Sequence, residues 1–259
     1  RALLEACRWR HAMTGRWQEP RPFVLGGPLT PAVKTLLITN VVVFLFQYVA
    51  QGLAHVRIDR IFGLVPYDVT HHLFLWQLVT YMFLHGGIWH IGFNMLALWM
   101  FGTELEAFWG TRRFTRFYFI TGIGAAICST LASWNSFIPT IGASGAIYGL
   151  LAAYGILFPD RTILLYFVIP IKAKYFVILM GLLAFWSSVT ASGSGVAHVA
   201  HLGGMLFGWL YLRYGWGDRS FRFRAPDLSG WRERRRQDKL KKKFKVYYRE
   251  TRGDKDDEE

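Results

Sequence analysis

The stretch YFVILMGLLAFWSSVTASGSGVAHVAHLGGMLFGWLYL, Tyr175–Leu212, contains no Lys, Arg, Asp or Glu. Two further runs, Leu36–Ala54 and Phe117–Thr140, also lack these residues. A helix needs about 20 predominantly apolar residues to cross the hydrocarbon core of a bilayer. The three runs therefore predict an all-α polytopic membrane protein.

We predict six membrane-spanning helices from these runs and from shorter apolar segments. The predicted helices cover residues 32–53, 85–103, 114–134, 144–158, 174–190 and 196–214. They form a membrane domain over residues 32–214, preceded by an N-terminal cytoplasmic segment (1–31) and followed by a charged cytoplasmic tail (215–259).

The orientation of the chain follows from its basic residues. The segment through Lys34 carries six Lys or Arg, the 103–113 turn two and the 159–174 link three. Of the loops on the other side of the membrane, the first carries two Lys or Arg, and loops 134–143 and 191–195 carry none. Because cytoplasmic loops are rich in Lys and Arg, both termini are predicted to be cytoplasmic. The expected location is a bacterial cytoplasmic membrane, with the chain as a multi-pass integral protein.

Part of the net charge of +13 comes from the tail, which carries 15 Lys or Arg and ten Asp or Glu. A polybasic segment after a membrane helix is attracted to anionic lipid, and a solvated tail is the alternative. No recognition module accompanies the basic residues, so nucleic-acid binding is not expected. The lipid bilayer is thus the expected partner of this part of the chain, and the oligomeric state is not predicted.

Three of the predicted helices begin with unusual polarity at the same membrane face. The second begins HGGIWHIGFN (His85–Asn94), the fourth begins with Ser144 of GASG (Gly142–Gly145), and the sixth contains AHVAHLGG (Ala197–Gly204). Polar residues inside a membrane are costly and are functional candidates. The fourth helix is also short, which places Ser144 below the outer surface, with loop 134–143 behind it and a cavity open to water.

Helix geometry pairs two of these polar residues. Small residues recur at every fourth position of the fourth helix (Gly145, Gly149, Ala153) and of the sixth (Ala200, Gly204, Gly208). Such stripes allow two helices to approach closely. If the stripes face each other, Ser144 and His201 lie on the same side of the interface, and His198 points away. Tyr148, one turn from Ser144, can then pack on the imidazole of His201.

The chemistry that these groups can perform is acyl transfer. A serine hydroxyl becomes a strong nucleophile when a neutral histidine accepts its proton, which gives Ser144 and His201 these two roles. The oxyanion of the tetrahedral intermediate needs hydrogen-bond donors. The candidates are the Ser144 backbone N–H and the side chains of His90 and Asn94. His90 and Asn94 lie one helical turn apart on the same helix face. The apolar helices place no carboxylate nearby, so the sequence predicts a dyad.

The motifs GASG, HGGIWHIGFN and AHLGGMLFG resemble the signature stretches of the rhomboid intramembrane serine proteases. The segment FGTELEAFWGTRRF resembles a fourth, with Glu106, Gly110 and Arg113 in the matching places. The resemblance covers about residues 32–214. One departure is Trp76-Gln77 in the first external loop, where many members carry a Trp-Arg pair.

The resemblance implies a six-transmembrane-helix bundle and an endopeptidase that cuts transmembrane segments of other proteins. Its catalytic residues would be Ser144 and His201, with an oxyanion hole made by His90, Asn94 and the Ser144 N–H. Tyr148 would stack on His201, with Gly142, Gly145 and His85 as supporting residues. His85 is expected to bond the loop backbone. No cofactor is implied.

Other interpretations compete with this one. Ser and Gly in a membrane helix commonly serve packing. A catalytically silent rhomboid-like protein that binds membrane clients would normally lack the serine or the histidine, and this chain has both. A transporter would show charged or discontinuous helices near the midplane. A metal site is not expected, because the histidines are poorly spaced and no Cys or carboxylate joins them.

Overall fold

The computed structural model describes residues 27–165, 168–190 and 195–215. The charged C-terminal tail and almost all of the N-terminal segment lie outside the described residues. Contacts within the chain divide it after Leu212, two residues before the end of the last helix, and the following concerns the first unit. Its elements are the helices α2 (Pro31–Ala54), α3 (Ile58–Phe62), α4 (Pro66–His71), α5 (Gln77–Thr80), the 3-10 turn η1 (Tyr81–Phe83), α6 (Ile88–Ala97), the π-helical turn η2 (Leu98–Gly102), α7 (Thr103–Trp109), α8 (Thr111–Ala132), α9 (Ser144–Leu157), the strands β1 (Thr162–Leu165) and β2 (Ile169–Lys172), α10 (Ala173–Thr190) and α11 (Gly195–Tyr214).

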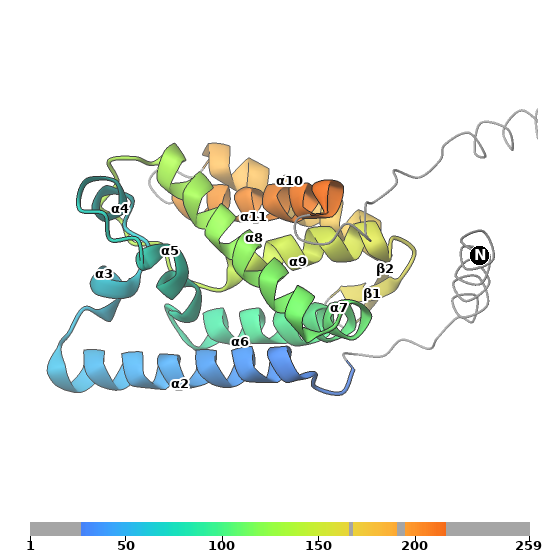
Figure 1. Ribbon diagram of the computed structural model, residues 1–259, viewed down its shortest axis with the longest axis horizontal. Coiled ribbons are helices and arrows are strands. Elements are labelled where there is room, and N and C mark those ends of the chain that lie inside the picture. The colour runs from blue at the N-terminus through green and yellow to red at the C-terminus, as the bar shows by residue number, and fades with distance from the viewer. Residues whose placement is uncertain (1–26, 166–167, 191–194, 216–259) are drawn as a thin grey trace, which may run out of the picture. The chain divides into compact units, whose positions relative to one another are not determined.

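All six predicted long helices are present, with shifted ends (Figure 1). The second differs most, because it begins at Ile88 rather than at residue 85 and passes through the π-helical turn η2. Gly86 and Gly87 delay its start, since glycine has no side chain to favour helical backbone and Gly87 is extended with φ of 165°.

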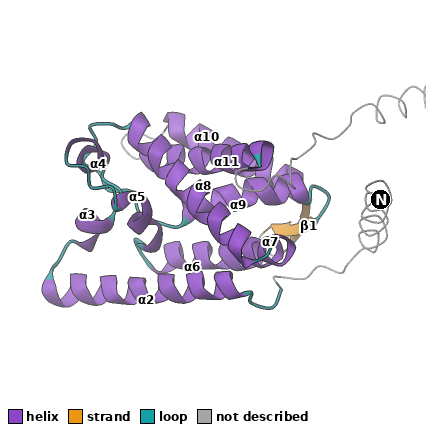
Figure 2. Cartoon of the chain, viewed as in Figure 1, coloured by secondary structure: helices purple, strands orange, loops and turns teal. Residues whose placement is uncertain are grey.

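Two segments predicted as plain loops contain regular structure (Figure 2). Residues 57–84, between α2 and α6, hold the three short helices α3, α4 and α5 and the turn η1. The 159–174 link holds an antiparallel hairpin in which Thr162 pairs with Lys172 and Leu165 with Ile169. These helices and strands have only four to six residues, too few to show a helical or a strand periodicity, so neither was predicted.

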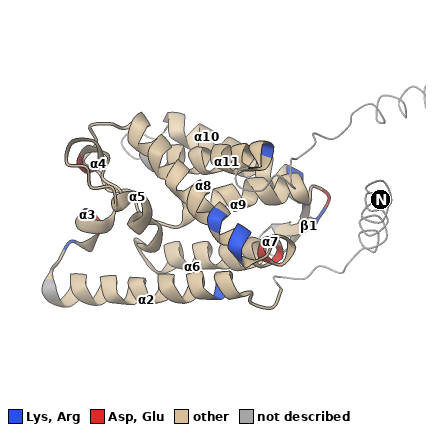
Figure 3. Cartoon of the chain, in the orientation of Figure 1, with Lys and Arg blue, Asp and Glu red and all other residues tan. Residues whose placement is uncertain are grey.

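Within the described residues, three helices are long and apolar enough to cross a membrane: α2 over Pro31–Leu53, α8 over Thr111–Ala132 and α10 over Ala173–Thr190. The helix α9 is apolar but shorter. Many large apolar side chains of α2 and α10 are exposed, among them Phe46, Leu53, Leu182 and Trp186. Figure 3 shows most charged residues of the described chain near the ends of the long helices, in the short helix α7 and in connecting segments. Such apolar outer faces fit a lipid environment.

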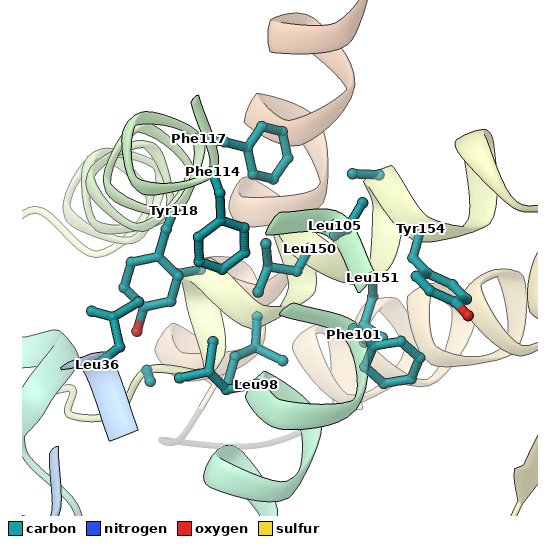
Figure 4. Close-up of a cluster of buried hydrophobic side chains, with 14 of the residues drawn as sticks. Leu36, Leu98, Phe101, Leu105, Phe114, Phe117, Tyr118, Leu150, Leu151 and Tyr154 are labelled. Carbon is teal, nitrogen blue, oxygen red and sulfur yellow. The ribbon is translucent and has the colours of Figure 1, made fainter. Parts of the chain in front are cut away.

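The core of the bundle is formed where α8, α9 and the α6–α7 region meet (Figure 4). Phe114, Phe117 and Tyr118 of α8 are fully buried. Leu150 of α9 and Leu98 of η2 fill the space beside them and are also fully buried. This packing fixes α9, the helix that begins with Ser144, against α8.

Glycines let α9 lie close to α11 as well. A Cβ atom on Gly204 would overlap the carbonyl oxygen of Gly145, and one on Gly208 would lie 2.9 Å from the carbonyl oxygen of Gly149. The prediction that the two small-residue stripes face each other is nevertheless wrong in one respect. The sides of Gly145 and Gly149 on which a side chain would stand point to α8, where added Cβ atoms would meet Ala125 and Thr121. α11 contacts the α9 backbone instead, because α9 has close neighbours on two sides.

Loop 134–143, which leads to Ser144, is held by the segment between α2 and α6. Leu64 and Thr140 form an isolated antiparallel bridge, with N–H···O distances of 2.9 and 2.8 Å. The N–H of Tyr67 bonds the carbonyl of Ser136 at 3.1 Å. The loop was predicted to need a cavity open to water, but these backbone groups are paired with protein, which also makes irregular backbone tolerable in a membrane.

Candidate active site

Ser144 is the first residue of α9. The first N–H groups of a helix have no partner within the helix, so the Ser144 N–H is placed to donate to a ligand. The chain enters the helix through Gly142, whose φ of 126° is unfavourable for any residue with a side chain. The Gly142 N–H donates to the carbonyl of Tyr81 at 2.9 Å, which fixes the approach to Ser144.

His201 of α11 lies beside Ser144. The distance between His201 Nε2 and Ser144 Oγ is 2.7 Å, a hydrogen bond between side chains 57 positions apart. The pair joins the two helices that helical geometry predicted. No described residue forms a hydrogen bond with His201 Nδ1, so the described part of the chain contributes no carboxylate as a third member.

Aromatic packing holds the imidazole of His201. The ring of Tyr148 is stacked on it, with centroids 4.2 Å apart and planes inclined by 3°. The ring of His198 lies edge-on to His201 at 5.9 Å, and no hydrogen bond joins His198 to Ser144. The structure thus brings Ser144, His201 and Tyr148 together and leaves His198 at the side of the group.

His90 lies on the other side of Ser144, across Gly142. A Cβ atom built on Gly142 would be 2.7 Å from His90 Nε2 and 3.7 Å from Ser144 Oγ. The small space left by the missing side chain therefore separates the His90 ring from the serine hydroxyl. His90 Nε2 therefore faces the space beside the serine hydroxyl, where the oxyanion of an acyl-transfer reaction would need a hydrogen-bond donor.

Asn94 and His85 are close to His90 rather than in contact with Ser144. Asn94 is buried, and its amide donates to the carbonyl of His90 at 2.8 Å. A second amide proton remains, because Asn carries two donors. The His85 ring lies edge-on to the His90 ring, with centroids 5.1 Å apart. The ring was expected to bond the loop backbone, but neither of its nitrogens forms a hydrogen bond with a described residue. The main chain of His85 is instead bonded by the Gln47 side chain, at both its carbonyl and its N–H.

Two residues that sequence reasoning missed support the site. The buried Tyr81 donates to the carbonyl of Gly122 at 2.7 Å and accepts from Gly142, so it links α8 to the loop before Ser144. Gly145 makes room for it, because a Cβ atom there would lie 2.8 Å from the Tyr81 hydroxyl. Gln47 is the second. An amide within the uncharged run of α2 was the available signal, since polar groups in membrane helices are rarely without a role.

The motif that contains Glu106 has a structural role away from Ser144. The carboxylate of Glu106 accepts hydrogen bonds from the N–H groups of Ala32 and Val33, both at 2.9 Å, and from the hydroxyls of Thr30 and Thr111. Burial alone would raise the pKa of Glu106, but these four bonds outweigh it and hold the pKa below its ordinary value. Glu106 therefore caps the N-terminus of α2.

Gln77, which stands where many members of the resembling family carry Arg, also has structural contacts. Its side-chain oxygen accepts from the Val65 N–H at 2.9 Å, and its nitrogen donates to the Ile61 carbonyl at 3.3 Å. The neighbouring Trp76 donates to the same carbonyl at 3.1 Å. Gln77 thus ties together the segment between α2 and α6. Among the described residues, no group of three or more His, Cys, Asp or Glu could hold a metal ion.

Comparison with known proteins gives relatives of one kind. Residues 72–217 match the family model of the rhomboid domain. Rhomboid protein 1, mitochondrial, of Saccharomyces cerevisiae is 39% identical over 145 residues, which cover 52% of this chain and 39% of the yeast protein. Rhomboid protease GluP of Bacillus subtilis is 37% identical over 134 residues, 52% of this chain and 25% of that protein. Rhomboid protease AarA of Providencia stuartii is 30% identical over 197 residues, 68% of this chain and 69% of that protein.

The matched region spans only about a quarter to two fifths of the yeast and Bacillus proteins. The relatives include a mitochondrial protein as well as bacterial ones, so the bacterial location of this chain stays a prediction. The family match covers more than half of the chain, and the apolar helices α2, α8 and α10 are those of an integral membrane protein. The chain belongs to the rhomboid family.

Proposed function

We propose that this protein is a serine endopeptidase that cleaves transmembrane segments of other membrane proteins within the bilayer. The observation that carries this proposal is the 2.7 Å contact between Ser144 Oγ and His201 Nε2. A hydroxyl bonded to an imidazole nitrogen is the arrangement by which a histidine activates a serine. The relatives GluP and AarA, both named rhomboid proteases, support the same function.

In the first step, Ser144 Oγ attacks the carbonyl carbon of the scissile peptide bond while His201 Nε2 takes the hydroxyl proton. The carbonyl oxygen becomes an oxyanion in the space beside Gly142. It accepts hydrogen bonds from the Ser144 N–H, from His90 and from the free amide proton of Asn94. Removing one such donor typically costs about 3–4 kcal/mol of transition-state stabilisation.

The tetrahedral intermediate then collapses. The peptide C–N bond breaks, and His201 gives its proton to the leaving amine, which leaves an acyl ester on Ser144. A water molecule, deprotonated by His201, attacks the ester carbonyl and releases the second product as a carboxylic acid. Tyr148 keeps the imidazole in one orientation through both steps, because its ring covers one face of His201.

The topology completes the proposal. The chain crosses the bilayer six times within residues 32–214, and both termini lie in the cytoplasm. Ser144 begins a helix of 14 residues, about 21 Å long at about 1.5 Å per residue. Since the hydrocarbon core is about 30 Å thick, the nucleophile lies below the outer surface. Substrate segments reach it from within the membrane, and the basic tail, which lies outside the described residues, faces anionic lipid.

Labelling with a fluorophosphonate serine probe tests the function. The purified full chain in detergent is expected to be labelled, whereas Ser144→Ala and His201→Ala are not, because the first lacks the nucleophile and the second its base. Both variants should keep the melting temperature of the parent within a few degrees. A folded parent protein that is not labelled would contradict the proposal and favour the client-binding, catalytically silent alternative.

A further inference from the structure

Gln47 of α2 holds the backbone of His85 from both sides. Its side-chain nitrogen donates to the His85 carbonyl at 3.0 Å, and its side-chain oxygen accepts from the His85 N–H at 3.1 Å. Gln47 is only 4% exposed. A buried amide with both of its groups paired to one residue fixes that residue in position and orientation. Gln47 thus connects α2 to the short segment that precedes α6.

The next residue along the chain bonds the ring of His90. The Gly86 N–H donates to His90 Nδ1 at 3.2 Å. A backbone N–H can only donate, so Nδ1 must be the acceptor and cannot carry a proton. A neutral imidazole then has its proton on Nε2. Nε2 is the ring nitrogen that lies against Gly142, next to Ser144.

These contacts form one chain from α2 to the candidate oxyanion hole. We propose that Gln47 is a positioning residue, which holds His85 and Gly86 so that the Gly86 N–H keeps the His90 proton on Nε2, facing Ser144. This inference rests on the proposed function, because it concerns the donor that His90 supplies to the oxyanion. Gln47 itself touches neither Ser144 nor the reacting atoms, and it acts through the backbone.

Packing alone is insufficient to hold this segment. Gly86 and Gly87 have no side chains and the widest backbone freedom of any residue. Together with Gln47 and His85 they line a cavity of about 970 Å³ between α2 and the start of α6. One side of the segment therefore borders open space. The two bonds from Gln47 supply the restraint that side-chain packing does not give here.

The variant that tests the proposal is Gln47→Met, which keeps the length of the side chain and removes both hydrogen bonds. Gln51→Met is the matched control. Gln51 lies one turn further along α2, lines the same cavity and makes no hydrogen bond with another described side chain or with His85. We expect Gln47→Met to lower the maximal rate of fluorophosphonate labelling roughly 10- to 100-fold, at an unchanged half-saturating probe concentration. Gln51→Met should label at the parent rate.

A double variant separates positioning from a general effect on stability. If Gln47 acts through His90, Gln47→Met combined with His90→Ala should label no more slowly than His90→Ala alone, because the group being positioned is already gone. Losses that multiply in the double variant would overturn the proposal. An unchanged rate in Gln47→Met would overturn it as well.

The position of the His90 proton can be measured directly, by nitrogen NMR of the parent protein labelled with 15N-histidine and assigned with His90→Ala. The proposal requires a protonated Nε2 and an unprotonated Nδ1 at His90. It also requires that Gln47→Met, but not Gln51→Met, change that pattern. A proton on Nδ1 in the parent would overturn the proposal even if no variant folds. This readout needs no enzymatic activity, so an unlabelled but folded parent would refute the proposed function while the NMR result still decides the role of Gln47.

Discussion

The ring of Tyr148 lies parallel to the imidazole of His201, with centroids 4.2 Å apart, one helical turn below the serine that His201 contacts. The contact is made by the faces of the rings, so the orientation of His201 depends on the aromatic ring of Tyr148 and not on its hydroxyl.

We therefore expect Tyr148→Phe to keep most of the labelling rate and Tyr148→Leu to lose roughly 10- to 100-fold, since a misplaced base reacts poorly. The measurement is the fluorophosphonate labelling rate in detergent, with melting temperatures recorded in parallel. Equal rates for the Phe and Leu variants would show that stacking does not position His201.

The two histidines of α11 should differ sharply in importance. His201→Ala removes the group that contacts Ser144, and labelling should fall to the level of Ser144→Ala. His198→Ala removes a ring that lies 5.9 Å from His201 and has no bond to Ser144, so most of the rate should remain. The comparison uses the same probe at one concentration. If His198→Ala lost labelling while His201→Ala kept it, the base would be His198 and not His201.

The contact between α9 and α11 predicts a steric effect on stability. In Gly204→Ala the new methyl group would overlap the carbonyl oxygen of Gly145, and the helices must separate at a cost of about 1–3 kcal/mol. The measured quantity is the melting temperature in detergent. Gly52→Ala is the control, because Gly52 is in a helix and has nothing within 4 Å of an added Cβ atom. A Gly204→Ala protein as stable as Gly52→Ala would exclude the close contact.

The cap that Glu106 makes on α2 predicts a dependence of stability on pH. The bonds from Ala32, Val33 and two threonines hold the pKa of Glu106 below its ordinary value of 4.5. The unfolded chain therefore binds the proton more tightly than the folded one, and the stability that the carboxylate contributes is complete above pH 4.5 and is lost as the pH falls through the folded-state pKa.

Accordingly, Glu106→Gln should be less stable than the parent at neutral pH, by about 2 kcal/mol for lost bonds to a buried charge. The difference should shrink as the pH falls below 4.5. Thermal unfolding of both proteins at several pH values measures this difference. A difference that stays constant down to low pH would mean that ionised Glu106 does not cap α2.

The long helices could be predicted from the sequence because uncharged runs of sufficient length have few alternatives in a membrane protein. The pairing of Ser144 with His201 was also accessible, since both lie at fixed angles from small residues on their helices. The reasoning was incomplete at Gly145 and Gly149, because a helix with two close neighbours has more than one small face. Sequence periodicity does not show which neighbour each face meets.

The contacts made by backbone groups were out of reach. The bridge between Leu64 and Thr140 and the bond from Gly86 to His90 join groups that every residue carries. Only the fold brings them together. Gln47 is an intermediate case, because an amide in an apolar helix signals a role, but its partner is a backbone segment 38 positions away.

The close approach of Gly204 to the Gly145 carbonyl has a consequence for how substitutions are tolerated. Where α11 meets α9 at these glycines, main chain lies on main chain, and no side chain stands between them to change rotamer. The spacing between Ser144 and His201 is then set by direct contact between the backbones of α9 and α11. The exposed apolar positions of α11, Leu206 and Trp209, can exchange one apolar residue for another without altering it, so this part of the outer surface is free to adapt to membranes of different composition.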